Sequence, residues 1–307
     1  MRLAFWAGLR WGVLGLVALG VSACGSDSAD DEEVDSELPV DWSAGTFMVS
    51  LEHDGLEREA IVYVPESYDP SADTPLMLNF HGFYGTARYH MEAGDLRPQA
   101  DRSGGILVVP QGADLDGSPH WNPSQLGGDN KSSIDDFGFL EALLDEIQLS
   151  YPYSASRVSA VGYSNGGMMA MGLACERSER IASVASISGT MLDFGCEFSH
   201  PISVMTIHGT RDDTVAYDGD GAYRGALDVV NYWRDENNTE DAERVTYTDG
   251  NTTIQHWPYE GGDAGTAVHH YKVVRGEHIW LTFDADGRAS NDILWDFLTA
   301  YSVEGRL

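Results

Sequence analysis

The hydrophobic pattern of the chain changes its period repeatedly after residue 45. Two segments, 46–55 and 58–66, alternate apolar with polar residues, as the half-exposed strands of a hairpin do. Several later runs are short and continuously apolar, which is typical of strands buried on both faces of a sheet. These runs are 75–80, 105–110, 157–162, 181–188 and 202–208.

Helix-like patterns lie between these runs. In 134–152 an i, i+3, i+4 stripe of apolar residues precedes Pro152, which ends the pattern. Residues 166–176 and 291–301 are further helical candidates. Because strands alternate with helices, the sequence predicts an α/β fold, with a mainly parallel central sheet, helices on both faces and an antiparallel N-terminal hairpin.

The N-terminal segment has the pattern of an export signal. Arg2 and Arg10 give it a basic start, and the apolar run 11–22 suits a signal peptide but is too short to span a bilayer. The letters VSAC, which end at Cys24, resemble the bacterial lipobox, so we expect Cys24 to carry a lipid. The alternative is ordinary secretion with cleavage at a small residue.

An acidic stretch follows Cys24. Residues 25–41 contain eight acids and no base, so this segment repels itself and is expected to be disordered. The sequence therefore predicts three parts: a lipoprotein signal peptide at 1–23, a tether at 24–41 and one folded domain at 42–307.

The whole chain is strongly acidic. It has 18 Lys and Arg against 49 Asp and Glu, which gives a net charge of −31. Such a charge opposes binding to nucleic acid or to an anionic membrane surface, so we expect a neutral or cationic substrate. Contact with a membrane is expected only through the N-terminal lipid.

Two cysteines remain besides the expected lipid attachment site. Export to an oxidising compartment makes Cys175 and Cys196 a candidate disulfide. The alternative is two separate buried thiols, and neither cysteine is assigned a catalytic role.

Ser164 lies in a G-x-S-x-G pattern, from Gly162 to Gly166, between the apolar run 157–162 and the helical segment 166–176. In a sharp turn between a strand and a helix, flanking glycines avoid collisions with the neighbouring backbone and the serine hydroxyl is exposed. The alternative is a purely structural turn. The strand, turn and helix context favours Ser164 as a nucleophile.

A serine nucleophile needs a base and an acid that orients the base. In this kind of fold they follow in the order Ser, acid, His. His278 lies in a loop between the strand-like segment 266–274 and the last helical segment, so we predict that it is the base. The acid is expected after the run 202–208, where Asp212 and Asp213 are adjacent; the spacing from His208 favours Asp212.

Backbone N–H groups are expected to stabilise the oxyanion. One is that of Asn165, directly after the nucleophile, and our candidate for the second is that of Phe83, in the loop after the run 75–80. His81 in the same loop is expected to brace it rather than to transfer protons. This chemistry requires no metal and no cofactor.

Several motifs together carry a family resemblance. In chain order they are NFHGFYGT, VVPQG, HWN, VGYSNGGMMA, LACE, IHGTRDDTVAY and GEHIW. The chain resembles the LpqC-like secreted esterases, which are grouped with polyhydroxybutyrate depolymerases and feruloyl esterases. The resemblance covers residues 47–301 and implies an α/β-hydrolase catalytic domain in which Ser164, Asp212 and His278 take the triad positions.

The substrate pocket is expected to include Tyr163, Trp121 and Trp280. Trp121 lies in the polar stretch 111–134, which is long enough for a functional loop. It is either an aromatic wall for a flat acyl group or a packing residue. Around His278 the family usually reads Gly-Gly-His-Thr-Trp-Pro, whereas this chain reads Gly-Glu-His-Ile-Trp-Leu at 276–281, so the pocket wall beside His278 departs from the family pattern.

The function expected from the sequence is that of an exported serine esterase acting on neutral acylated saccharides, of the feruloyl or acetylxylan type. A depolymerase of polyhydroxybutyrate or another short polyester, or a general carboxylesterase, is the alternative within the same chemistry. A surface protein that binds without turnover is the alternative from another class.

Overall fold

The computed structural model describes residue 38, residues 42–127 and residues 129–307. The expected signal peptide, Cys24 and most of the acidic tether lie outside the described residues. The division of the chain at residues 23 and 41 therefore stays a prediction.

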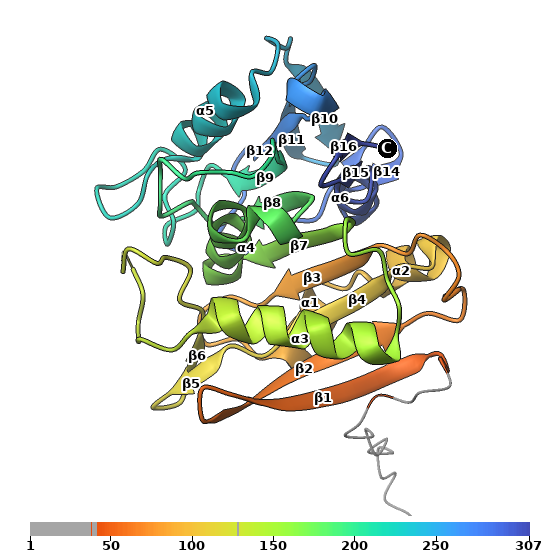
Figure 1. The fold of residues 1–307 in the computed structure, drawn as a ribbon. Helices are drawn as coiled ribbons and strands as arrows, with labels where there is room; N and C mark the ends of the chain where they lie inside the picture. The colour runs from red at the N-terminus through yellow and green to blue at the C-terminus, as the bar shows by residue number, and fades with distance from the viewer. Residues whose placement is uncertain (1–37, 39–41, 128) are drawn as a thin grey trace, which may run out of the picture. The chain divides into compact units, whose positions relative to one another are not determined.

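One ten-stranded sheet forms the centre of the described domain (Figure 1). Its order is β1-β2-β4-β3-β7-β8-β9-β12-β11-β10. The run from β4 to β12 is parallel, and an antiparallel pair extends the sheet at each edge. Its strands are β1 (Gly45–His53), β2 (Leu56–Val64), β3 (Leu76–Phe80), β4 (Ile106–Pro110), β7 (Val158–Tyr163), β8 (Ser183–Ile187), β9 (Ser203–Gly209), β10 (Val245–Asp249), β11 (Thr252–Tyr259) and β12 (Val268–Val273).

Helices cover both faces of this sheet (Figure 1). Strand side chains alternate between the two faces, so β3 sends Leu78 into one core with α3, α4 and α5, and Met77 into a second core with α1, α2 and α6. The predicted α/β layers and N-terminal hairpin are confirmed. The helices are α1 (Ala87–Ala93), α2 (Arg97–Ser103), α3 (Asp136–Ser150), α4 (Asn165–Glu176), α5 (Ala226–Asn237) and α6 (Ser290–Leu298).

Short strand pairs lie outside the central sheet. Within the polar stretch 111–134, β5 pairs with β6, so part of this stretch is a small hairpin. Two further pairs flank α6 along the chain. These strands are β5 (Ala113–Leu115), β6 (Ser118–His120), β13 (Asp284–Ala285), β14 (Arg288–Ala289), β15 (Tyr301–Ser302) and β16 (Gly305–Arg306).

A disulfide joins Cys175 in α4 to Cys196, with the two Cα atoms 5.3 Å apart. The structure thus contains the paired cysteines rather than two separate thiols. In the part of the chain that the structure describes, no helix combines the length and the apolar character that crossing a membrane requires.

Candidate active site

Ser164 occupies a sharp turn between β7 and α4. Its φ of 56° and ψ of −119° are strained for a residue with a side chain, and its N–H donates to the Ile187 carbonyl oxygen, which holds the turn against β8. A Cβ atom on Gly162 would lie 2.2 Å from the Gly166 oxygen, and one on Gly166 would lie 2.3 Å from the Phe80 oxygen. Both glycines of the pattern are therefore required by close backbone approach.

The loop after β12 brings His278 to Ser164. The His278 Nε2 atom lies 2.9 Å from Ser164 Oγ, and its Nδ1 atom lies 2.8 Å from Asp212 Oδ2. The Tyr163 hydroxyl donates to the His278 carbonyl oxygen over 2.7 Å, which fixes the backbone that carries the imidazole. Because an ionised Asp212 can only accept, Nδ1 carries the proton and Nε2 is free to accept the serine proton.

Asp212 lies at the end of β9 and is buried. Its Oδ1 atom accepts from the backbone N–H groups of Thr214 and Val215, over 3.0 and 2.8 Å. Burial alone would raise the pKa of Asp212, but contacts with His208, His278 and the Val215 N–H outweigh it and hold the pKa well below its usual range. Asp212 therefore stays ionised beside the imidazole.

The neighbouring Asp213 is exposed. No hydrogen bond or ion pair within the described residues involves its side chain. Of the two adjacent acids, the structure places only Asp212 against His278.

The loop after β3 also lies beside Ser164. A Cβ atom on Gly82 would lie 3.3 Å from the Ser164 Cβ, so the backbone that leads into Phe83 adjoins the serine. The Asn165 N–H belongs to the first turn of α4, where backbone donors have no acceptor within the helix. Both expected oxyanion donors thus belong to backbone beside Ser164.

His81 fixes the loop that contains Gly82 and Phe83. The Gly112 N–H donates to His81 Nε2 over 2.9 Å, so Nδ1 carries the proton and donates to the Gly82 oxygen over 2.8 Å. Burial lowers the pKa of His81 to about 4, which keeps it neutral. One ring nitrogen thus bonds to Gly82 of this loop and the other to Gly112 after β4, as the bracing role requires.

Trp121 is fully buried, which corrects the expectation that it forms a wall of the substrate pocket. Its indole N–H donates to the His81 carbonyl oxygen over 3.0 Å, and its ring packs edge-on against Phe80. The Asn165 side chain accepts from the Trp121 N–H and donates to the Trp121 oxygen. Trp121 therefore packs beneath the site and ties the loop after β3 to the turn at Ser164.

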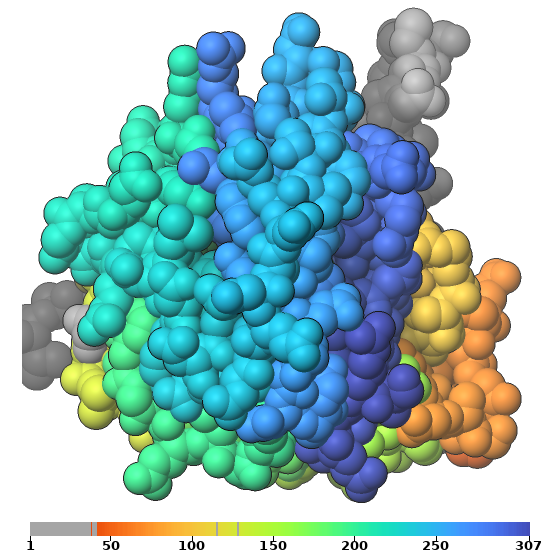
Figure 2. Space-filling model, turned by 90° about the horizontal axis from the view of Figure 1, so that it is seen from above, coloured from red at the N-terminus to blue at the C-terminus, as the bar shows by residue number. Residues whose placement is uncertain are grey.

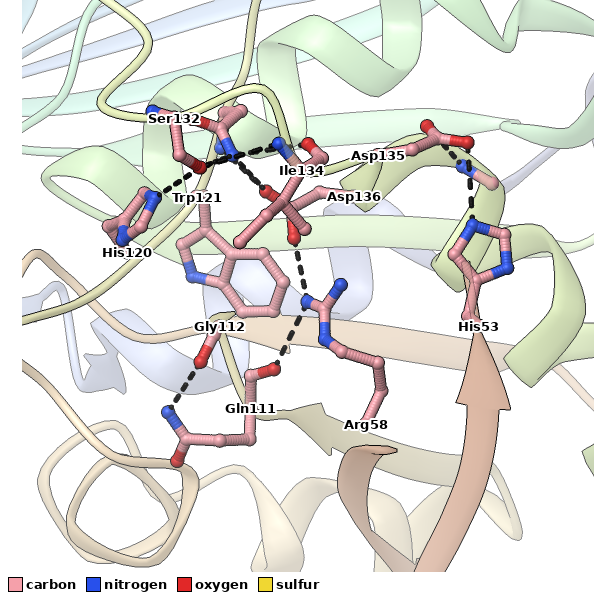
Figure 3. A network of polar contacts seen from close by, with 12 residues as sticks. His53, Arg58, Gln111, Gly112, His120, Trp121, Ser132, Ile134, Asp135 and Asp136 are labelled. Atoms are coloured by element: carbon pink, nitrogen blue, oxygen red, sulfur yellow. Dashed lines mark hydrogen bonds and ion pairs between the residues drawn. The ribbon is translucent and has the colours of Figure 1, made fainter. Parts of the chain in front are cut away.

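A buried ion pair supports the backbone next to Trp121 (Figure 3). Arg58 Nη2 lies 2.6 Å from Asp136 Oδ1, and both side chains are almost completely buried. The other carboxylate oxygen, Oδ2, accepts from the backbone N–H and the side-chain amide of Asn122, over 2.8 and 3.0 Å. Sequence reasoning missed this pair because its two residues lie far apart along the chain.

An aromatic pocket of about 320 Å³ lies next to Gly82 and Phe83. Tyr163 and Trp280, both expected there, line it. Tyr84 and Tyr89 also line it and are largely exposed, and neither was predicted from the sequence. Tyr84 has a φ of 62°, an unusual value for a bulky residue, so a strained turn presents its ring to the pocket.

No group of three or more His, Cys, Asp or Glu side chains within the described residues is arranged to hold a metal ion.

His269 and His270 alternate across the sheet. His270 contacts Thr206 and Tyr217 in the interior, and His269 packs near Phe297 of α6. Of these two and His278, only His278 makes a hydrogen bond to Ser164 in the described residues.

The fold and this side-chain cluster define the chain as an α/β-hydrolase. A mainly parallel sheet carries a serine turn between a strand and a helix, followed in chain order by an acid and a histidine. Residues 53–286 match the family described as "Putative esterase", and the chain belongs to this esterase family.

Curated relatives include enzymes named feruloyl esterase and acetylxylan esterase. The chain is 24% identical over 249 residues to "Probable feruloyl esterase C" of Aspergillus terreus, covering 79% of this chain and 84% of the relative. It is 25% identical to feruloyl esterase B of Piromyces equi and 24% identical to a bifunctional acetylxylan esterase/xylanase of Neocallimastix patriciarum, covering 80% and 82% of this chain. The chain spans 46% and 34% of the lengths of these two relatives.

Solved structures share the fold at low sequence identity. An acetyl xylan esterase from Aspergillus awamori superposes with a TM-score of 0.60 at 13% identity, covering 83% of this chain and 98% of that one. Esterase PE8 gives a TM-score of 0.52 at 19% identity, covering 77% of this chain and 95% of that one. At these identities the similarity establishes the fold.

Proposed function

We propose that this protein is a serine carboxylic ester hydrolase with Ser164 as nucleophile, His278 as base and Asp212 as the acid that orients the base. The observation that carries the proposal is the continuous contact from Ser164 Oγ through His278 to Asp212, at 2.9 and 2.8 Å. This arrangement activates a hydroxyl that is otherwise a weak nucleophile.

The reaction takes place in two halves. His278 Nε2 accepts the proton as Ser164 Oγ attacks the ester carbonyl carbon, and the imidazolium then protonates the departing alcohol. Water next attacks the acyl-serine with His278 again as base, and the acid and the free serine are released. The Asp212 carboxylate stabilises the imidazolium in both halves.

The backbone N–H groups of Phe83 and Asn165 are the proposed donors to the oxyanion. Loss of one such donor typically costs about 3 kcal/mol in the transition state. The hydrogen bonds that His81 and Trp121 make to this loop support a hole that exists before the substrate binds.

The proposed substrates are neutral saccharides that carry feruloyl or acetyl esters. Tyr84, Tyr89, Tyr163 and Trp280 give the pocket flat aromatic walls, which suit a planar acyl group. The net charge of −31 disfavours anionic substrates. The names of the relatives point to the same ester classes.

The proposed location is outside the cytoplasm. The support is the signal-peptide pattern that ends at Cys24, with the lipid on Cys24 as the anchor and the acidic segment after it as a spacer. Labelling of cells with a radioactive fatty acid, compared with a Cys24→Ser variant, tests the anchor. Incorporation into the variant, or none into the wild type, would contradict it.

A substrate panel tests the proposed activity. Wild type and Ser164→Ala are assayed with p-nitrophenyl acetate, methyl ferulate, acetylated xylan and 3-hydroxybutyrate oligomers. Turnover of the first three by the wild type alone is the expected result. Turnover confined to the hydroxybutyrate oligomers would favour a polyester depolymerase, and no turnover by folded wild type would favour a binding protein.

A further inference from the structure

A second cavity, of about 360 Å³, shares no lining residue with the pocket next to Phe83. β10, β11 and β12 provide one wall, and the pair β13 and β14, α6 and the residues after α6 provide the other. In Figure 2 the lighter blue segment that contains β10 and β11 lies beside the dark blue C-terminal segment. The volume lies within the range of small-molecule sites, about 300–1,000 Å³.

The strand register puts a row of ring side chains on this face. His256 of β11 pairs with Tyr271 of β12, and His269 lies two residues before Tyr271, so all three side chains point to the same side of the sheet. The Tyr271 ring stacks on His256 with centroids 4.0 Å apart. Phe297 of α6 faces His269 from the opposite wall.

Two buried nitrogen atoms of the row have no hydrogen-bond partner in the described part of the chain. His256 Nε2 lies 3.3 Å from His269 Nδ1, which uses one nitrogen of each ring. The remaining atoms, His256 Nδ1 and His269 Nε2, are buried and make no hydrogen bond within the described residues. Buried polar atoms nearly always have a partner, so two neighbouring exceptions on one cavity mark a place where a bound molecule can supply the missing hydrogen bonds.

The two rings offer one donor and one acceptor. His269 Nε2 lies 3.6 Å from Glu260 Oε1, so this nitrogen is favoured to carry a proton. His269 Nδ1 then accepts from His256 Nε2–H, and His256 Nδ1 is left as a bare acceptor. Burial lowers the pKa of His256 to about 3 and of His269 to about 4, so both rings are neutral.

The charges at the cavity do not favour an anionic ligand. Both lining arginines are paired, Arg306 with Glu260 and Arg288 with Asp296, and the remaining lining charge is that of Asp286, on the exposed turn between β13 and β14. A purely apolar ligand would leave the two imidazole nitrogens unpaired. The walls therefore match a neutral ligand that has hydroxyl groups on its edge and an apolar face for Tyr247.

We propose that this cavity is a binding site for a neutral saccharide unit, separate from the site at Ser164. A pyranose ring has the required chemistry, because its hydroxyls lie around the edge and its C–H groups form the faces. The binding does not depend on ester hydrolysis. Its use in holding the enzyme on a glycan rests on the proposed function.

Calorimetric titration of the full chain tests the site, with xylohexaose, cellohexaose and mannohexaose as probes. The His256→Phe variant keeps a ring against Tyr271 but removes both nitrogens, and Tyr247→Ala removes part of the aromatic wall. Each is expected to weaken binding of the hexasaccharide that the wild type binds by about ten-fold or more, the loss of roughly one good contact.

Trp257→Ala is the matched control. Trp257 lies next to His256 on β11 but points to the opposite face of the same edge hairpin, where it stacks on His270. The saccharide affinity of Trp257→Ala is expected to stay within two-fold of that of wild type, roughly the scatter of such measurements. Thermal unfolding of all three variants identifies any that lose the fold. If His256→Phe or Tyr247→Ala does so, the other of these two decides.

The outcomes separate this site from the proposed activity. Binding that weakens in His256→Phe and Tyr247→Ala but not in Trp257→Ala supports the site, and hydrolysis of p-nitrophenyl acetate should be unchanged in these variants. No binding of any of the three probes, or equal binding by every variant, would overturn it. A wild type that binds saccharide without hydrolysing esters would reject the proposed function and keep the site.

Discussion

The Asp136→Asn substitution tests the ion pair beneath the site (Figure 3). It leaves the Arg58 guanidinium charged and buried, with Nη2 facing a neutral amide in place of the carboxylate 2.6 Å away. It also places an amide nitrogen where one carboxylate oxygen accepts, either opposite Arg58 or opposite Asn122. Breaking a buried pair in this way typically costs about 3–5 kcal/mol, against a total stability of about 5–15 kcal/mol.

Urea unfolding followed by far-UV circular dichroism measures this effect. We expect the unfolding free energy of Asp136→Asn to fall by about 3–5 kcal/mol. Asp135→Asn is the matched control, because Asp135 is exposed and caps α3 by accepting the Gly138 N–H. Asparagine caps a helix equally well, so the unfolding free energy of this variant should change by about 0.5 kcal/mol or less. A loss below about 1 kcal/mol in Asp136→Asn would refute the reasoning, because the pair would then carry no more than a surface ion pair.

Three further predictions follow from the same contacts. Asp212→Asn should lower kcat by about 10⁴-fold in a p-nitrophenyl acetate assay, because an amide does not hold the imidazole in its proper tautomer. The kcat of Asp213→Asn should be near that of wild type. Equal losses in the two variants would contradict the assignment. Replacing both Cys175 and Cys196 by serine should cost about 3 kcal/mol in urea unfolding, since the bridge closes a separation of 21 residues, and an unchanged midpoint would contradict this. Burial lowers the pKa values of His81 and His90 to about 4 and about 3, below the unfolded value of about 6.5. Their contribution to stability is therefore present above pH 6.5 and is lost as the pH falls toward 4. Urea midpoints should fall between pH 7 and pH 4, less steeply in His90→Gln, and a midpoint that rises as the pH falls would contradict the sign.

Local patterns predicted those parts of the fold where one segment determines its own structure. Residues 158–162 before Ser164 are all buried, and serine is the only polar side chain among them. The glycines around Ser164 are needed by backbone contacts within the same strand, turn and helix, so the pattern could be read from sequence. His278 could be placed because its loop follows a strand and precedes the last helix.

Other features depend on contacts between distant segments. Trp121 has the chemistry of a pocket wall, but the packing of β5 and β6 against the loop after β3 buries it. The hairpin of β10 and β11 is an edge element with many exposed polar residues, so its pattern was too weak to predict. Arg58 and Asp136 give no sequence signal of a pair, because β2 and α3 meet only in the folded chain.

Covalent labelling tests the central claim most directly. Diethyl p-nitrophenyl phosphate phosphorylates an activated serine, and mass spectrometry of the digested protein locates the added group. We predict modification of wild type at Ser164 alone, at a rate that falls by about 10³-fold or more in His278→Ala as the base is lost. Modification elsewhere with Ser164 untouched, or undiminished ester hydrolysis by Ser164→Ala, would contradict the account.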